Sequence, residues 1–227
     1  MIKTALIFAA GRGERLMPYT KDTPKPMLMV GNEPLLAFHI QNLKACGIEH
    51  IIINHAYLGY KIRQYFGNGQ SFGLHIEYLP EPPGALETGG TLAFLKECLH
   101  PKHEVLLTIN ADIYTDYQAN PNFELSPNAH AHLVLIPTQK DLPPGNFGLD
   151  PQTHQIHVHS KDLIFSGIGF YQLAALQDLP KGRYSIRNWL FTQAQAGQLT
   201  GEIYQGLWQD IGTPSAWQKT KLLLAQR

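Results

Sequence analysis

Short apolar runs alternate with helix-like patterns through the first half of the chain. The apolar runs predict strands at residues 4–10, 50–55, 74–79 and 104–112, and the continuous run at 4–10 is typical of a strand buried on both faces. Between these runs, apolar positions recur every three or four residues, which predicts helices at residues 33–47, 58–67 and 88–99. This order of elements predicts an α/β fold with an open, doubly wound, mostly parallel sheet and right-handed crossovers.

Beyond Asp116 the pattern changes to strands joined without helices. Apolar runs predict strands at residues 132–137, 156–160 and 163–172, and turn-rich segments separate them. We expect residues 117–182 to extend the sheet and to add a small antiparallel hairpin over its ligand-binding edge. The remaining patterns predict a helix at 185–197, a strand with a turn at 201–212, and a helix at 213–226 that Thr213 caps. With no repeat and no long linker, residues 1–227 are predicted to form a single domain.

Composition narrows the classes of function. The chain has 227 residues, of which 44% are hydrophobic and 16% charged, so it can bury a substantial core. Its formal net charge is zero, so no overall basic field attracts nucleic acid or an anionic membrane, and we expect neither partner. Any recognition of phosphate must therefore depend on a local cluster of residues.

The cysteines and the apolar segments predict a cytoplasmic protein. Cys46 and Cys98 lie far apart without metal-type spacing, which favours free buried thiols in a reducing compartment. The opening apolar run superficially resembles a signal peptide, but it passes directly into a glycine-rich loop and is interpreted as a strand. No segment approaches the roughly 20 apolar residues of a membrane span. The sequence leaves the oligomeric state open.

A glycine-rich loop follows the first predicted strand, in the stretch LIFAAGRGERLMPYTKDTPKPM at residues 6–27. It lacks the Lys-Ser/Thr pair of a Walker A loop and the third glycine of a dinucleotide-binding fingerprint. Gly11 and Gly13 allow the backbone positive φ angles and a close approach of its N–H groups to an anion. The loop is therefore predicted to bind phosphate in a mode of its own.

Three cations accompany this loop: Arg12, Arg15 and Lys25. Pro24 and Pro26 restrict the backbone on both sides of Lys25 and so fix the direction of its ammonium group. A solvated surface lysine needs no such restriction. Arg15 and Lys25 are therefore predicted to bind phosphate groups.

Two carboxylates follow apolar strands far apart in the sequence. Asp112 ends the predicted strand at 104–112, and Asp210 lies in the stretch LWQDIGT. Ligands bind outside the carboxyl ends of the strands in open α/β sheets. Asp112 alone is equally consistent with a turn cap. Two carboxylates beside a polyphosphate, however, are what Mg²⁺ requires, so the pair predicts a magnesium site if the two meet in space.

These motifs together resemble the sugar-1-phosphate nucleotidyltransferases. The resemblance rests on Gly11-x-Gly13-x-Arg15-Leu16-x-Pro18, Thr23-Pro24-Lys25-Pro26, Asp112 and Trp208-x-Asp210-x-Gly212-Thr213, and it spans nearly the whole chain. Further stretches resemble the branch of the family that transfers UMP to N-acetylmuramate 1-phosphate in peptidoglycan recycling: INHAYLG, LETGGTL, NADIYTDY and FSGI.

The resemblance implies a Rossmann-like nucleotidyltransferase fold and one in-line displacement. A sugar 1-phosphate attacks the α-phosphorus of a nucleoside triphosphate, here UTP, and pyrophosphate leaves. A phosphate monoester is already largely dianionic at pH 7, so no general base is needed. By carry-over, Arg15 holds the leaving phosphates, Lys25 holds the phosphates near the attacked centre, and Asp112 and Asp210 hold Mg²⁺. Gly11, Arg12, Gly13 and Ala111 are the other nucleotide contacts, with residues 1–116 as the nucleotide-binding half and 117–227 as the sugar-binding half.

Glu81 lies where many relatives place a side chain that reads the base. A carboxylate only accepts hydrogen bonds, so it can take the ring N–H of uracil, thymine or guanine but disfavours adenine and cytosine. The preference for uridine rests on the resemblance alone, and a solvated loop glutamate remains an alternative. On the sugar side, Asn146 aligns with a sugar-contacting acid of the muramate branch, and Ala111 replaces the common glycine before the metal-binding aspartate.

Other interpretations stay open. The acceptor could be another sugar 1-phosphate, such as glucose or mannose 1-phosphate, with transfer of UMP, GMP or dTMP. A protein of another class, a non-catalytic regulatory subunit that binds sugar nucleotides, would be expected to lose its charged catalytic positions. His157 and His159 share a predicted strand face but have no third ligand at a firm spacing, so zinc is not predicted there. For His55, a structural hydrogen bond and a ligand contact are about equally favoured.

Overall fold

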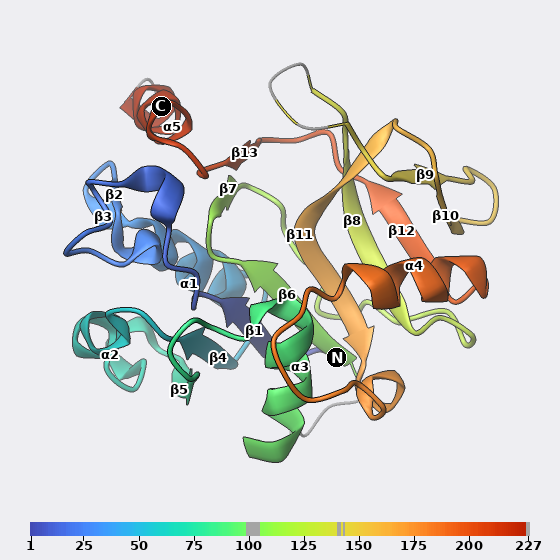
Figure 1. The fold of residues 1–227 in the computed structure, drawn as a ribbon, viewed down its shortest axis with the longest axis horizontal. Coiled ribbons are helices and arrows are strands. Elements are labelled where there is room, and N and C mark those ends of the chain that lie inside the picture. The colour runs from blue at the N-terminus through green and yellow to red at the C-terminus, as the bar shows by residue number, and fades with distance from the viewer. Residues whose placement is uncertain (99–104, 140–141, 143, 226–227) are drawn as a thin grey trace.

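The computed structural model describes residues 1–98, 105–139, 142 and 144–225. The first half of the chain alternates strands and helices as predicted (Figure 1): β1 (Thr4–Phe8), α1 (Leu35–Ala45), β4 (His50–His55), α2 (Gly59–Phe66), β5 (His75–Pro80), α3 (Glu87–Cys98) and β6 (Val105–Asn110). Strands β6, β1, β4 and β5 are neighbours in this order and pair in parallel. The predicted doubly wound α/β fold is confirmed.

Helices cover both faces of this parallel sheet. On β4, Ile51 and Ile53 join the hydrophobic cluster formed with α1 and α2, whereas Ile52 joins the cluster formed with α3. Because successive side chains of a strand point to opposite faces, an uninterrupted isoleucine run fits a strand buried on both sides. α4 (Arg187–Gln195) contributes Leu190 to the same cluster as α3.

The second half of the chain continues the sheet with antiparallel pairs. Its strands are β8 (Ala131–Pro137), β9 (Phe147–Leu149), β10 (Ile156–Val158), β11 (Leu163–Gln172) and β12 (Leu199–Ile203). β11 pairs antiparallel with β8 along one side and with β6 along the other, and its first residue, Leu163, also pairs with Phe147 of β9 on the side opposite β8. Among the described residues, nine strands form one sheet. Seven of them follow the order β10-β9-β11-β6-β1-β4-β5, and in addition β8 pairs with β11 and β12 pairs with β8. The hairpin β9–β10 is the small antiparallel element.

Some short elements differ from the sequence prediction. The turn-rich segment at 140–155 contains β9, and residues 201–212 belong to two sheets rather than to one strand with a turn. The latter part forms β13 (Trp208–Asp210), which pairs antiparallel with β7 (Ile113–Thr115). β2 (Met29–Val30) and β3 (Glu33–Pro34) form another two-stranded sheet. Strands of two or three residues are too short to produce a recognisable periodicity.

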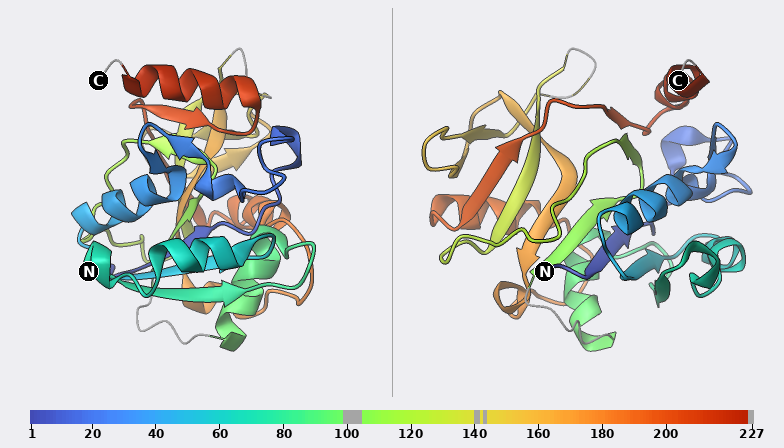
Figure 2. Two further views of the ribbon diagram at one scale, coloured as in Figure 1. Left: turned by 90° about the vertical axis from the view of Figure 1, so that its left-hand side faces the viewer. Right: turned by 180° about the vertical axis from the view of Figure 1, so that it is seen from behind.

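The last helix, α5 (Pro214–Ala225), returns to the amino-terminal segment (Figure 2). Trp217 Nε1 donates to the carbonyl oxygen of Met29 at 2.9 Å, and Trp217 packs in a cluster with Leu16. The backbone N–H of Ala216 donates to Thr213 Oγ1 at 3.3 Å, which confirms the predicted cap. This packing carries the segment before α5 to the loop after β1.

Two further features concern the apolar helices and the cysteines. Within the described residues, no helix has both the length and the apolar character needed to cross a membrane. Cys46 is a buried free thiol, as predicted. The side chain of Cys98 lies outside the described part of the structure.

Candidate active site

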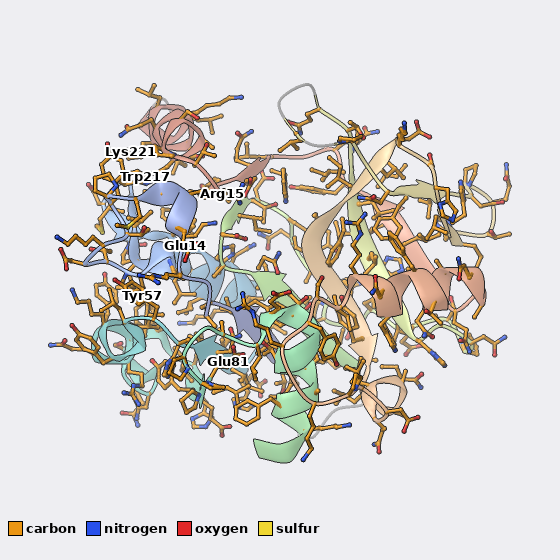
Figure 3. The ribbon with its side chains drawn as sticks, viewed as in Figure 1. Glu14, Arg15, Tyr57, Glu81, Trp217 and Lys221 are labelled. Carbon is orange, nitrogen blue, oxygen red and sulfur yellow. The ribbon has the colours of Figure 1, made fainter. Side chains whose placement is uncertain are left out.

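A cleft of about 1380 Å³ lies at the carboxyl ends of the parallel strands. The segments that follow β1, β4, β5 and β6 all contribute to its walls, as the sequence predicts for an open α/β sheet. In Figure 3, Arg15 lies toward β13 and Glu81 lies toward β5 and α3, and both side chains line the cleft. The predicted site residues that line it are Gly11, Arg12, Gly13, Arg15, Lys25, Glu81, Ala111 and Asp112.

The two glycines of the loop after β1 have different conformations. Gly13 has φ of 69°, and a Cβ atom there would lie 3.0 Å from Lys25 Cβ and 3.1 Å from Thr20 Cγ2. This close approach and the left-handed backbone both favour glycine. The expected positive φ at Gly11 is wrong, since only Gly13 of the pair adopts it. A Cβ atom on Gly11 would meet no atom within 4 Å, so the absence of a side chain there leaves space in the cleft.

Lys25 and Asp112 form a hydrogen-bonded ion pair in the cleft. Lys25 lies in the short helix η2 (Lys25–Met27), behind Pro24, and its side chain is 8% exposed. Its Nζ donates to Asp112 Oδ2 at 2.8 Å, and the Asp112 side chain is 39% exposed. The buried stem thus directs a cation at a carboxylate that still faces the open cleft.

Asp210 joins this pair through the β7–β13 sheet. Asp210 pairs with Ile113, the residue after Asp112, and the N–H of Ile211 donates to the Asp112 carbonyl oxygen at 2.8 Å. Burial raises the pKa of the Asp210 carboxyl above its ordinary value, and the negative charge of Asp112 raises it further. Lys25 and Arg15 lower this pKa without cancelling the increase. The structure therefore brings two carboxylates, separated by 98 positions in the sequence, into one electrostatic cluster.

The two loop arginines have different surroundings. Arg15 lies in η1 (Glu14–Leu16), and its Nη2 lies 2.8 Å from the position that a Cβ atom on Gly212 would occupy. Asp210 Oδ2 lies 2.7 Å from the same position, so a side chain at Gly212 would displace both charged groups. Arg12 extends over the ring of Tyr57, with 5.2 Å from its guanidinium carbon to the ring centroid. Both arginines line the cleft.

Glu81 is buried, with 8% of its surface exposed, and is fixed by three donors. Its Oε1 accepts from Asn54 Nδ2 at 2.7 Å and from Thr91 Oγ1 at 2.5 Å. Its Oε2 accepts from the N–H of Leu86 at 2.8 Å. Because each carboxylate oxygen has two lone pairs, one acceptor position remains on Oε2. The alternative of a solvated loop glutamate is excluded.

The other predicted contacts fall into two groups. Ala111 is buried at the cleft wall, and its N–H donates to the carbonyl oxygen of Phe8 at 3.0 Å. Asn146 is not among the residues that line the main cleft. Its Oδ1 accepts from Arg187 Nη2 at 2.6 Å, between the start of β9 and the first turn of α4. His55, also outside the lining, packs with its Nδ1 2.1 Å from the position of a Cβ atom on Gly59. Its buried Nε2 has no hydrogen-bond partner within the described residues, so the structural hydrogen bond expected for it is not seen at that atom.

Several residues of the site escaped the sequence analysis. Asn54 joins two parts of the cleft, since its Oδ1 accepts from the N–H of Ala9 at 2.6 Å while its Nδ2 donates to Glu81. Arg183 and Ser185 reach the cleft from the segment before α4. His39 of α1 is 3% exposed and contacts the backbone of Ile113, next to Asp112. The position of Asn54 near the end of a strand was the one available signal, because polar residues there face the ligand edge.

Comparison with protein families gives one match that covers most of the chain. Residues 4–160 match the family model described as nucleotidyl transferase. The N-acetylmuramate alpha-1-phosphate uridylyltransferase of Neisseria meningitidis serogroup B is 36% identical to this chain over 216 residues, which cover 92% of this chain and 93% of that protein.

More distant proteins share the fold. The mannose-1-phosphate guanylyltransferase of Mycobacterium tuberculosis is 28% identical over 92% of this chain, which spans 61% of that protein's length. A crystal structure of a UDP-glucose pyrophosphorylase with UDP-glucose superimposes with a TM-score of 0.81, over 100% of this chain and 99% of that chain. At 17% identity the latter likeness establishes the fold alone.

Proposed function

Because the chain belongs to the nucleotidyl transferase family and is a sugar-1-phosphate nucleotidyltransferase, we propose that it transfers UMP from UTP to N-acetylmuramate 1-phosphate and releases pyrophosphate. Identity of 36% to a uridylyltransferase for this sugar, over nearly the full length of both chains, supports the choice of substrates. The proposed role is in peptidoglycan recycling in the cytoplasm. The free buried thiol of Cys46 fits that reducing compartment.

The charge arrangement in the cleft supports the reaction type. The acceptor phosphate is largely dianionic at pH 7 and attacks the α-phosphorus of UTP in line with the bond to the leaving pyrophosphate. A bond forms between an oxygen of the sugar phosphate and the α-phosphorus of UTP. At the same time the bond breaks between the α-phosphorus and the oxygen that joins it to the β-phosphate. No proton needs to be removed from the attacking phosphate. The protein therefore has to position two anions and neutralise their charge.

We propose that Lys25 and Arg15 neutralise the negative charge of the phosphates. Lys25 extends its ammonium group into the cleft from a buried stem, which suits the phosphates next to the attacked centre. Arg15, on the side of Asp210, suits the departing pyrophosphate. Gly11, Arg12 and Gly13 add backbone N–H groups and a second guanidinium at the open end of the loop.

The pair of carboxylates fits a divalent cation. Burial and mutual repulsion raise the pKa of Asp210, and a cation between Asp210 and Asp112 would relieve both effects. Oxygen ligands and neighbouring phosphates are what Mg²⁺ prefers, so we propose that Asp112 and Asp210 hold Mg²⁺. When bound, Mg²⁺ supplies charge stabilisation for the phosphate oxygens. In this proposal, the Lys25 ammonium group then donates to a phosphate oxygen in place of the Asp112 carboxylate.

The base and the sugar are assigned to opposite halves of the chain. In residues 1–116, the free acceptor position on Glu81 Oε2 suits the ring N–H of uracil, and Ala111 provides the wall beside the nucleotide. In residues 117–227, we propose that Asn146 contacts the sugar. Its Oδ1 accepts from Arg187, so its amide N–H groups are the ones to offer to sugar oxygens.

A second candidate is transfer of GMP to mannose 1-phosphate. The 28% identity to a mannose-1-phosphate guanylyltransferase favours it, and Glu81 can accept the ring N–H of guanine as well as that of uracil. A non-catalytic subunit is disfavoured because Arg15, Lys25, Asp112 and Asp210 are all present and clustered.

Pyrophosphate release in a panel of nucleotides and sugar 1-phosphates tests the proposal. UTP with N-acetylmuramate 1-phosphate is expected to give the highest kcat/KM, and omission of Mg²⁺ is expected to abolish turnover. Highest activity with GTP and mannose 1-phosphate would establish the second candidate instead. Background turnover with every pair, in protein that binds UDP-sugars, would support the regulatory subunit.

A further inference from the structure

Three potential metal ligands converge at the end of the sheet opposite the cleft. His50 begins β4 and pairs with His75, which begins β5, and Glu77 follows His75 by two positions. Paired residues on neighbouring strands and residues two apart on one strand point to the same face of a sheet. The two strands therefore present all three side chains together.

The distances between the ligand atoms suit a small transition-metal ion. His75 Nε2 lies 3.0 Å from Glu77 Oε1, and His50 Nε2 lies 3.4 Å from Glu77 Oε2. One ligand atom from each residue lies within 4.8 Å of the other two. Zinc bonds of about 2.0–2.1 Å in a tetrahedron separate two ligand atoms by roughly 3.3 Å. The side chains thus need only small rotations to share one ion.

The ring arrangement brings the two imidazoles together. The rings of His50 and His75 stack, with centroids 5.1 Å apart and planes 27° apart. The His75 side chain is 62% exposed, and the Glu77 side chain is 36% exposed, so an ion and a water ligand can enter from solvent. Two imidazoles with one carboxylate form a donor set suited to Zn²⁺.

This cluster is separate from the active site. None of its three residues lines the cleft. Asn54 and Glu81, which line the cleft, follow His50 and Glu77 by four residues each. Four residues span about 13 Å at the usual rise of a strand. β5 is the edge strand of the sheet and pairs with β4 alone among the described strands.

We propose that His50, His75 and Glu77 form a Zn²⁺ site that links the edge strand β5 to β4 at their amino ends. Water completes the coordination of the ion. Because the ion binds the folded arrangement of both strands and not the unfolded chain, it stabilises the sheet edge without taking part in nucleotidyl transfer.

Co²⁺ is the spectroscopic probe for the test, with metal-free full-length protein. Co²⁺ bound in a tetrahedron with imidazole ligands absorbs visible light strongly, whereas Co²⁺ at an oxygen-rich site absorbs weakly. The wild type and Asp210→Asn, which alters the proposed Mg²⁺ site, are expected to develop the strong band at one equivalent. His75→Ala and Glu77→Gln are expected to lose most of it. A strong band retained by both variants, or missing from the wild type, would overturn the proposal.

A thermal measurement gives the matched comparison. Slightly more than one equivalent of Zn²⁺ is expected to raise the Tm of the wild type. The same rise is expected for His157→Ala, a control that removes an exposed histidine from β10. His75→Ala is expected to lose this shift while it retains the wild-type kcat/KM with Mg²⁺, because His75 lies outside the cleft. An equal Zn²⁺ shift in His75→Ala and the wild type would contradict the assignment.

Discussion

The Lys25 ammonium group donates to the Asp112 carboxylate at 2.8 Å, across 87 positions of sequence. The lysine side chain is buried, whereas the aspartate side chain is more than a third exposed and lines the cleft. Asp210 joins this pair through the β7–β13 sheet, and Lys25 and Arg15 both lie close enough to lower its pKa. In the proposed mechanism the two carboxylates hold a divalent cation, and Lys25 donates to a phosphate oxygen in place of Asp112 when the phosphates enter.

Replacement of Lys25 by alanine is expected to lower kcat/KM by about 100-fold or more, because a preorganised cation at the reacting phosphates is lost. Initial rates of pyrophosphate release measure this effect. Lys21→Ala, which removes a lysine with an exposed side chain from the same segment, is the matched control and is expected to retain activity. Near-normal turnover of a correctly folded Lys25→Ala protein would exclude the proposed role.

Asp210→Asn is expected to separate stability from function. A carboxyl group with a raised pKa binds its proton more tightly in the folded state than in the unfolded state. Its charged form therefore destabilises the fold as the pH rises through that pKa, and the uncharged asparagine removes the penalty. At pH 7 in EDTA, the variant is expected to have a higher Tm than the wild type.

The same variant is expected to need a higher Mg²⁺ concentration for half-maximal turnover, because an amide is a weaker ligand for this ion than a carboxylate. A titration of turnover with Mg²⁺ at saturating UTP measures the change. If the titration curve coincides with that of the wild type, Asp210 has only a structural role.

Glu81→Gln is expected to raise the KM for UTP by roughly 10-fold, the scale of a lost hydrogen bond to a charged group. The amide places an NH₂ group where the carboxylate accepts, either against Asn54 and Thr91 or against the N–H of Leu86. Glu49→Gln, at an exposed glutamate that pairs with Lys3 and does not line the cleft, is the control of equal size. Equal KM values for wild type and Glu81→Gln would remove Glu81 from base recognition.

Buried histidines are expected to make the fold sensitive to acid. Burial lowers the pKa values of His39 and His132 from 6.5 to about 4. At a pH between about 4 and 6.5, these histidines bind protons in the unfolded chain but not in the folded chain. The free energy of unfolding therefore decreases as the pH falls below 6.5. Each histidine is expected to remove about 2 kcal/mol from the free energy of unfolding between pH 7 and pH 5.

Urea unfolding of His132→Asn at the two pH values tests this expectation. The asparagine retains a polar partner for Thr200, whose Oγ1 lies 3.0 Å from His132 Nδ1. The variant is expected to lose less stability than the wild type between pH 7 and pH 5. An identical loss in both proteins would show that His132 does not titrate as its burial predicts.

Local patterns predicted the parts of the fold that depend on one element at a time. The strand His50–His55 and the strand Leu163–Gln172 coincide with predicted runs, because burial of a strand demands apolar side chains at every or every other position. The cap at Thr213 follows from its own side chain. The motif around Gly13 and Lys25 predicted which residues gather at the first loop, although the backbone angle expected at Gly11 was wrong.

By itself, the sequence determined the α/β class, the longer strands and helices, and the cationic side chains that accompany the glycine-rich loop. Only the tertiary structure decided that Asp210 meets Asp112, that Asn54 and Thr91 fix Glu81, and that His50 meets His75 and Glu77. These contacts arise from pairing between distant segments. The periodicity of a segment records which of its faces is buried, but it does not record which other segment covers that face.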